Sequence, residues 1–263
     1  MNSSNAKVVI VTGGTFGIGQ ATTLLLASRG WQVVACGLDT PQPGSIAEGG
    51  SEMTNQLLAE RGLVADILEC DVSSVSDVSR LVDSVLTRFG RIDGLVNNAA
   101  IHPRGTILET SEETFDRVVA VNLRGMFLVT KQVLPHMIAR GGGAIVNVGS
   151  GSGWGKPDLL AYSASKGGVH AFTMALAYDH LHQHIRVNCV IPGGTISGMT
   201  TGIHQGAGFS RAAAKTVTGT HNKPEDIAMA CAFLLSNEAR QISGTFLDVG
   251  CFAHQGGPIP SRT

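Results

Sequence analysis

Tyr162 and Lys166 lie four residues apart in a segment with a helical pattern, so their side chains share one face about 5–6 Å apart at Cβ. An unperturbed phenol has a pKa of about 10 and exchanges protons poorly at pH 7. A nearby ammonium favours the phenolate, so we expect Lys166 to lower the pKa of Tyr162. The pair therefore predicts an acid/base group. Taken alone, the same spacing is more often a packed tyrosine beside a solvated lysine.

A glycine-rich segment near the amino terminus could bind phosphate. It reads Thr12-Gly13-Gly14-Thr15-Phe16-Gly17-Ile18-Gly19, directly after an apolar run and at the start of a helical pattern. Glycines allow a tight turn and close backbone approach, and the free N–H groups and dipole of a helix N-terminus attract a pyrophosphate. As a bare pattern the segment could be structural. In this position it predicts dinucleotide binding.

The elements that position these motifs alternate along the whole chain. Short runs rich in valine and isoleucine predict strands at residues 7–12, 32–36, 64–70, 94–97, 144–149, 186–191 and 245–249. Helical patterns lie between them, at residues 18–29, 52–61, 74–89, 112–140, 161–180 and 224–235. This alternation predicts an α/β fold: a doubly wound, Rossmann-type three-layer sandwich with a seven-stranded parallel sheet.

Composition limits the other possibilities. The 263 residues show no compositional boundary, so we expect one domain over residues 1–263. A net charge of −1 without a basic run argues against nucleic acid. No apolar run approaches the ~18 residues of a membrane span, and Met1 to Ala6 is polar, which predicts a cytoplasmic protein. The cysteines are Cys36, Cys70, Cys189, Cys231 and Cys251. Their odd number and wide spacing predict reduced core thiols, with no disulfide or metal centre.

Two segments interrupt the alternation. Residues 37–50 hold two prolines and four glycines and predict a loop after the second strand. Residues 193–223 lack periodicity. So long an irregular segment in a compact domain is usually a lid or binding loop, and we expect a substrate lid at residues 194–222.

Taken together, the motifs resemble the short-chain dehydrogenase/reductase family over essentially the whole chain. The family's T-G-x-x-x-G-x-G loop matches Thr12 to Gly19, its N-N-A-G matches Asn97-Asn98-Ala99-Ala100, and its Y-x-x-x-K pair matches Tyr162 and Lys166. Its helix asparagine matches Asn122, its P-G after a strand matches Pro192-Gly193, and Ser197 stands where a threonine usually lies beside the nicotinamide.

The resemblance implies a catalytic tetrad and hydride transfer between a secondary alcohol or ketone and a nicotinamide cofactor. Tyr162 would be the acid/base, and Lys166 would lower its pKa and bind the nicotinamide ribose. Ser150 would hold the substrate oxygen, and Asn122 would position a water in the proton relay. By itself, Asn122 is more simply read as a helix amide that bonds its own backbone.

The segment from Gly149 to Pro157, which we call the serine segment, departs from the family pattern. The family serine lies thirteen residues before the tyrosine, where this chain has Gly149, and Ser150 lies twelve before it. We interpret this as a one-residue deletion after Gly153, with Ser152 as the alternative catalytic serine. At the other end of the chain, Val249-Gly250-Cys251-Phe252 replaces the common V-D-G-G.

Cofactor preference depends on the end of the second strand. Gly37 occupies the family's acidic position, Asp39 lies twenty residues after Gly19, and Leu38 and Phe16 stand where NADP enzymes often carry basic residues. We therefore predict NAD, with NADP as the alternative. Asp39 could bind the ribose or form an Asx turn before Pro41. Asp71-Val72 resembles the family's adenine contact, and Ser73 or Ser74 could cap the next helix instead.

The expected cofactor-binding residues are Gly13, Thr15, Phe16, Gly17, Ile18, Gly19, Leu38, Asp39, Asp71, Val72, Asn98, Ala99, Tyr162, Lys166, Pro192, Gly193 and Ser197.

Residues expected to flank the substrate pocket suggest a polar or anionic small-molecule alcohol or ketone. They are His102, Arg104, Trp154, Lys156, Met199, His204, Phe209 and Arg211, and for each of them alone a solvated or packing role is the more common one. The alternative function is a nucleotide-sensing or scaffolding protein of the same fold without turnover. The resemblance also implies a homo-oligomer, a tetramer or dimer, formed through the helices at residues 112–140 and 161–180.

Overall fold

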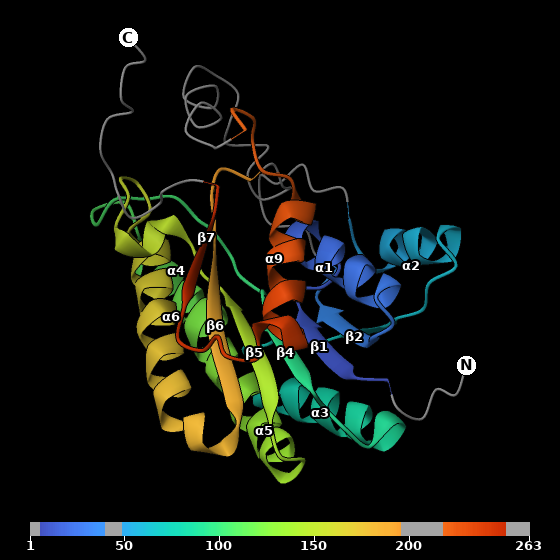
Figure 1. Ribbon diagram of the computed structural model, residues 1–263. Coiled ribbons are helices and arrows are strands. Elements are labelled where there is room, and N and C mark those ends of the chain that lie inside the picture. Colours follow the sequence, from blue (N-terminus) through green and yellow to red (C-terminus); the bar gives the residue numbers. More distant parts are fainter. Residues whose placement is uncertain (1–5, 40–48, 196–217, 251–263) are drawn as a thin grey trace.

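A parallel sheet forms the centre of the computed structural model, which describes residues 6–39, 49–195 and 218–250 (Figure 1). Its seven strands run in the order β3-β2-β1-β4-β5-β6-β7. They are β1 (Val8–Thr12), β2 (Gln32–Gly37), β3 (Asp66–Glu69), β4 (Gly94–Asn97), β5 (Gly143–Val148), β6 (Ile185–Pro192) and β7 (Phe246–Val249). The order reverses between β1 and β4, and such a switch point is where open α/β sheets bind ligands. The predicted doubly wound fold is confirmed.

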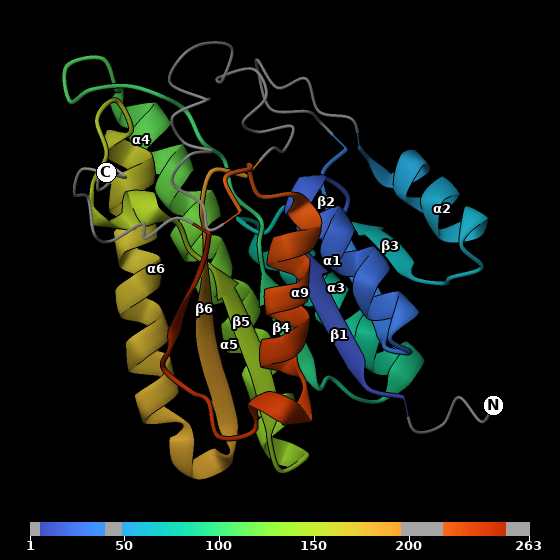
Figure 2. The same cartoon turned by 45° about the horizontal axis from the view of Figure 1, so that its top comes forward.

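Helices cover both faces of the sheet (Figures 1 and 2). Helices α1 (Gly17–Ser28) and α9 (Pro224–Leu235) pack on one face. Helices α3 (Val75–Phe89), α5 (Met126–Ala139) and α6 (Leu160–Asp179) pack on the other. The remaining helical elements are α2 (Ser51–Glu60), α4 (Glu112–Val119), a π-helical turn η2 (Ala120–Gly125) and the 3₁₀ turns η3 (Gly151–Trp154), η4 (Leu181–Gln183) and η5 (Asn237–Ala239).

The strands are apolar along their length because both faces of the sheet are buried. In β1, Val8 and Ile10 belong to the core under α3 and α5, while Val9 and Val11 belong to the core under α1 and α9. A strand in this position reads as a continuous apolar run rather than an alternating one. This is why the sequence predicted the strands well.

The carboxyl ends of several strands are joined by hydrogen bonds between polar residues of the motifs found in the sequence. Thr12 Oγ1, at the end of β1, accepts hydrogen bonds from the backbone N–H groups of Asn98 (3.0 Å) and Ala99 (3.1 Å). Asn97 Nδ2, at the end of β4, donates to Asn147 Oδ1 on β5 at 2.9 Å. These bonds hold the glycine segment and the Asn97–Ala100 segment at one edge of the sheet.

Two elements differ from their predicted ranges by more than one residue at an end or in continuity. The third strand covers Asp66–Glu69 rather than residues 64–70, and Val64 is exposed. The helix predicted over residues 112–140 is divided by the π-turn η2, because one extra residue is accommodated where Asn122 makes its side-chain bonds. Such π-turns often occur at functional sites.

The described cysteines Cys36, Cys70, Cys189 and Cys231 are free and buried, as predicted. Among the described residues, no helix has the length and apolar character needed to span a membrane. In the same residues, no group of three or more histidine, cysteine, aspartate or glutamate side chains could hold a metal ion.

Candidate active site

Helix α6 carries Tyr162 and Lys166 in the interior of the protein. Their exposed fractions are 7% and 2%. Lys166 Nζ donates a hydrogen bond of 2.7 Å to the carbonyl oxygen of Val148, the last residue of β5, and lies 5.7 Å from the centre of the Tyr162 ring. The predicted helical spacing is present, but the ammonium is directed at the sheet rather than at the phenol oxygen.

Burial sets the proton affinities of this pair. Desolvation raises the pKa of Tyr162 to about 12, and a side-chain hydrogen bond with Ser150 acts in the opposite direction. Desolvation also lowers the pKa of Lys166 to about 8. The shift of Tyr162 is opposite to the one expected from its spacing to Lys166, because loss of water around the phenol outweighs the hydrogen bond with Ser150 and the ammonium is directed at the Val148 carbonyl.

Ser150 lies between β5 and η3, in an extended conformation that caps the 3₁₀ turn. Its Oγ accepts a 3.1 Å hydrogen bond from the backbone N–H of Ser152, and its side chain bonds Tyr162. This geometry favours Ser150 over Ser152 as the serine beside the phenol.

Asn122 sits in the π-turn η2 and joins two neighbouring segments. Its Oδ1 accepts from Ile101 N–H at 2.8 Å, and its Nδ2 donates to the Ile101 carbonyl at 2.9 Å and to Ser165 Oγ at 3.0 Å. Ser165 Oγ in turn donates to the Tyr162 carbonyl at 2.8 Å. The reading of Asn122 as a helix amide bonded to its own backbone is wrong. Sequence analysis missed Ser165, although it lies inside the Tyr162–Lys166 motif.

The glycine segment forms a cradle at the start of α1. Gly13 has φ +61°, and a Cβ there would lie 2.9 Å from Ala99 Cα, so only glycine fits without strain. Helix α1 begins after Phe16 without a side-chain cap, which leaves its N-terminal N–H groups available. Thr15 Oγ1 is buried and has no hydrogen-bond partner among the described residues. An uncapped helix N-terminus beside an orphaned hydroxyl suits a phosphate-bearing ligand.

The other predicted residues of this segment have structural contacts. Asn98 Nδ2 donates to the carbonyls of Thr12 (3.1 Å) and Gly13 (3.0 Å). Phe16 forms an isolated antiparallel bridge with Gly49, and the backbone N–H of Gly50 donates to the Thr15 carbonyl at 2.9 Å. Gly17 and Ile18 begin α1, and Gly19 lies against the Gly13 backbone.

At the end of β2, Asp39 has a role that sequence analysis did not foresee. Its Oδ1 accepts from the backbone N–H (2.9 Å) and the hydroxyl (2.8 Å) of Ser51, the first residue of α2. The carboxylate therefore stabilises the N-terminus of α2, where the helix dipole favours negative charge. Leu38 is exposed beside it. Pro41 lies outside the described residues, so the predicted Asx turn cannot be compared.

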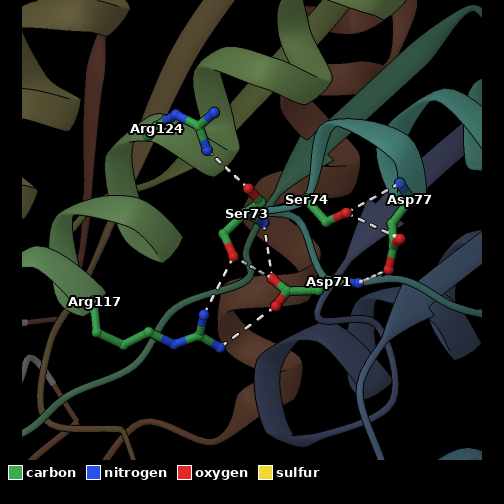
Figure 3. A network of polar contacts seen from close by, with 6 residues as sticks. All are labelled: Asp71, Ser73, Ser74, Asp77, Arg117 and Arg124. Atoms are coloured by element: carbon green, nitrogen blue, oxygen red, sulfur yellow. Dashed lines mark hydrogen bonds and ion pairs between the residues drawn. The ribbon is translucent and has the colours of Figure 1, made fainter.

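Asp71 belongs to a network of polar contacts after β3 (Figure 3). Its Oδ1 accepts from Ser73 N–H (2.8 Å) and Ser73 Oγ (2.6 Å), and its Oδ2 lies 3.5 Å from Arg117 on α4. The backbone N–H of Asp71 donates to Asp77 Oδ2 at 3.1 Å. Ser74 caps α3, as one of the two predicted capping residues. Hydrogen bonds from Ser73 hold the pKa of Asp71 below its usual value despite opposition from partial burial.

Val72, the second residue of the predicted adenine contact, is buried against the π-turn. A Cβ on Gly125 would lie 2.8 Å from Val72 Cγ2, so the two segments pack backbone to side chain. The predicted adenine-contact pair is therefore held in place by the chain's own groups.

Pro192 is the last residue of β6 and Gly193 follows it, at the same edge of the sheet. Gly193 N–H donates to the Val249 carbonyl at 3.0 Å, and Asn222 Nδ2 donates to the same carbonyl at 2.6 Å. The Val249 carbonyl, in the altered C-terminal motif, therefore joins Gly193 and Asn222, the residues at the two ends of the predicted lid. Ser197 and most of that lid, residues 196–217, lie outside the described residues and the prediction stays untested.

The structure places some of the predicted substrate residues near the phenol. The rings of His102 and Tyr162 meet edge to face, with centroids 4.3 Å apart. Arg104 pairs with Asp158 at 3.5 Å, and Lys156 N–H donates to Ser163 Oγ at 3.3 Å. The ring of Trp154, the last residue of η3, packs against His170 instead. Met199, His204, Phe209 and Arg211 lie outside the described residues.

Comparison with known proteins identifies the class. Residues 7–208 match the sequence profile of short chain dehydrogenases. The chain is 34% identical to a 3-oxoacyl-[acyl-carrier-protein] reductase of Thermotoga maritima, over 92% of this chain and 96% of that protein. It is 37% identical to a cyclopentanol dehydrogenase of Comamonas testosteroni, over 95% of this chain and 97% of that protein.

A solved structure agrees with these relatives. An actinorhodin polyketide ketoreductase crystallised with NADPH superposes with a TM-score of 0.85 at 34% identity, over 97% of this chain and 100% of that one. The chain therefore belongs to the short-chain dehydrogenase/reductase family, whose members are oxidoreductases that use nicotinamide cofactors. The resemblance found in the sequence is confirmed.

Proposed function

We propose that the protein interconverts a secondary alcohol and a ketone by hydride transfer, with Ser150, Tyr162 and Lys166 of the predicted tetrad as its catalytic residues and Asn122 as a positioning residue. The observation that carries this proposal is the buried phenol of Tyr162, hydrogen-bonded to Ser150 with Lys166 one helical turn away. Two hydroxyls that converge beside an ammonium can hold a substrate oxygen and exchange a proton with it.

The chain's residues fit a nicotinamide dinucleotide. Thr15 Oγ1 is a buried hydroxyl without a partner among the described residues, and the N-terminus of α1 is uncapped. When bound, the nicotinamide accepts or supplies the hydride. We expect Lys166 to bind the ribose, with its Nζ keeping or exchanging the bond to the Val148 carbonyl.

The proton transfer is assigned to Tyr162. Because burial raises the pKa of Tyr162 to about 12, the phenol is protonated at neutral pH and is ready to donate to a ketone oxygen. Ser150 holds that oxygen through its own hydroxyl. Both ends of the Asn122 amide are engaged with Ile101 and Ser165, so its contribution is to hold the π-turn against α6 rather than to bind water through the amide.

We propose NAD as the preferred cofactor. Leu38 and Phe16 offer no cation to a 2′-phosphate, and the Asp39 carboxylate beside them would repel one. The NADPH-bound ketoreductase makes NADP the competing choice, but its preference belongs to that protein.

Turnover with a substrate panel tests the proposal. Polyols, hydroxy acids and diketones would each be assayed with NAD(H) and NADP(H), with Tyr162→Phe as the matched control that keeps the ring and loses the hydroxyl. We expect turnover of at least one polar substrate, lost in the variant while cofactor affinity is retained. Dinucleotide binding without turnover on any substrate would favour the alternative, a nucleotide-sensing protein. Activity within tenfold of wild type in Tyr162→Phe would remove the assignment of the acid.

We also propose a homo-oligomer. Phe115 on α4, Phe127 on α5, and Met174 and Tyr178 on α6 are large apolar side chains that are exposed in the single chain. Exposed apolar groups on neighbouring helices are typical of a subunit interface. Analytical ultracentrifugation should give a dimer or tetramer, and Phe127→Glu with Tyr178→Glu should shift it towards monomer.

A further inference from the structure

His170 is a buried histidine that the proposed chemistry does not use. It lies four residues after Lys166 on α6, so Tyr162, Lys166 and His170 follow one another on one helical face. Its exposed fraction is 8%, and its Nε2 has no hydrogen-bond partner among the described residues. A polar ring buried to this degree needs a reason, since apolar side chains fill such space at lower cost.

The imidazole packs directly on the backbone of the serine segment. A Cβ on Gly149 would lie 3.1 Å from His170 Nε2, and a Cβ on Gly153 would collide with Cε1. The ring of Trp154 lies on another side, with centroids 4.4 Å apart, and that of Phe246 on β7 is 5.2 Å away. His170 is therefore enclosed by residues on both sides of Ser150 and by the last strand.

His170 also bonds Ser150 itself. The Ser150 backbone faces the imidazole as a hydrogen-bond acceptor and raises its pKa, and because Nε2 is buried without a partner among the described residues, we assign this contact to Nδ1. The Ser150 carbonyl also accepts from Gly153 N–H at 2.9 Å, while Ser150 Oγ accepts from Ser152 N–H at 3.1 Å. These bonds fix both the backbone and the hydroxyl of the serine.

We propose that His170 is a positioning residue: its neutral imidazole holds the shortened serine segment so that the Ser150 hydroxyl meets Tyr162. This inference rests on the proposed function of Ser150. Because Ser150 lies twelve rather than thirteen positions before Tyr162, the segment is one residue shorter between the serine and the phenol. A misplacement of about 1 Å can cost a hundredfold in rate, so a group that fixes the segment acts on catalysis without touching the substrate.

The charges around the ring favour its neutral form. Burial and the Lys166 ammonium both lower the pKa of His170. Cys189, which faces it from β6, is a neutral thiol whose pKa burial raises to about 12. Trp154 and Phe246 carry no charge, and Asp248 lies two residues beyond Phe246 on β7.

A double-mutant cycle on the full-length protein tests the coupling. Ser150→Ala should lower kcat by about a hundredfold, and His170→Leu, which keeps an apolar side chain and loses the donor, by about tenfold. If His170 acts through Ser150, the double variant should match Ser150→Ala within about twofold. A double variant whose loss of kcat equals the product of the two single losses would overturn the proposal. No effect of Ser150→Ala would instead overturn the proposed function.

Two further variants separate positioning from packing. His170→Asn keeps an amide donor near Nδ1 but is smaller, so it should retain kcat within about threefold while lowering Tm more than His170→Leu. Loss of kcat that simply follows loss of Tm in both variants would make the role structural. His180→Leu, the same substitution at the half-buried C-cap residue of α6, should leave kcat and cofactor KM unchanged.

Nuclear magnetic resonance of the imidazole nitrogens provides a test that needs neither turnover nor a leucine variant that folds. The His170 signals, assigned by their loss in His170→Asn, should show a neutral ring protonated at Nδ1 at pH 7. A charged ring, or one protonated at Nε2, would contradict the proposal.

Discussion

The polar groups of the catalytic corner (Ser150, Tyr162 and Lys166) and those of the β2–β3 corner (Asp39, Asp71 and Asp77) lie at the same edge of one sheet, but in different surroundings. Tyr162 and Lys166 are almost fully buried, and desolvation is the largest cause of both pKa shifts. Asp77 lies at the surface, where hydrogen bonds from Asp71 N–H and Ser74 lower its pKa.

The difference shows how one fold keeps side chains that exchange protons apart from side chains that hold a loop in place. Burial suppresses charge, so the catalytic corner holds a protonated phenol and an easily deprotonated ammonium, both able to exchange protons. Hydrogen bonding in the exposed corner preserves charge and fixes loop geometry, with little change in reactivity. Substitutions in the two corners should therefore differ in kind as well as in size.

Replacing Lys166 by methionine should give the largest effect, and it should change activity and thermal stability in opposite directions. We expect kcat to fall by about a thousandfold, because the ammonium serves both the ribose and the phenol. The pKa of Lys166, lowered to about 8, means that the folded state binds this proton less tightly than the unfolded chain does. Stability is therefore reduced below pH 8 and recovers as the pH rises through 8 towards 10.5. Removing the charge should raise Tm at pH 7 by a few degrees, measured by calorimetry.

A lower Tm in Lys166→Met would mean that the hydrogen bond to the Val148 carbonyl outweighs the desolvation of the ammonium. An unchanged cofactor affinity would contradict the dual role of Lys166.

The two serines of the catalytic corner should differ strongly. Ser150→Ala removes the hydroxyl that bonds Tyr162, and we expect kcat to fall by about a hundredfold. Ser152→Ala keeps the backbone N–H that donates to Ser150, and we expect a change below about threefold. Steady-state kinetics of both variants measures the contrast. The reverse order would move the catalytic role to Ser152.

The direction of reaction should set the pH dependence. Alcohol oxidation needs the phenolate as base, and below the raised pKa of Tyr162 the phenolate fraction grows up to about tenfold per pH unit. We expect the oxidation rate to rise between pH 6 and 8 and the reduction rate to stay flat over the same range. An oxidation rate that is flat over this range would show that bound cofactor has already brought the pKa of Tyr162 below neutrality.

Cofactor preference should respond to changes in the β2–β3 corner. Leu38→Arg with Asp39→Ser supplies a cation for a 2′-phosphate and removes a repulsion, so the ratio of kcat/KM for NADP to that for NAD should rise by about tenfold or more. Serine at position 39 keeps an oxygen that can accept from Ser51 N–H, which limits damage to α2. Asp39→Ser alone is the control. A wild-type protein that already uses both cofactors equally would refute the NAD preference.

Arg117→Ala should give the smallest effect. Its contact with Asp71 is 3.5 Å long and half exposed, and such ion pairs contribute about 0–1 kcal/mol. We expect cofactor KM to change by less than about threefold and Tm by at most a few degrees. Arg80→Ala, which removes the exposed pair with Asp77, is the matched control. A tenfold change in KM for Arg117→Ala alone would show that the exposed corner does more than anchor the loop.

The sequence by itself determined the order of strands and helices, the glycine cradle and the Tyr162–Lys166 pair. These features depend on residues that are close in the chain: apolar runs reflect burial on both faces, and four-residue spacing reflects the helical turn. Only the tertiary structure decided that burial raises the pKa of Tyr162 and that Asn122 bonds Ile101 and Ser165. It also decided that the Asp39 carboxylate stabilises the N-terminus of α2 and that His170 lies against the serine segment. Each of these features depends on segments that are distant in sequence, which either exclude water from a side chain or bring a partner close to it. Local sequence patterns do not contain that information.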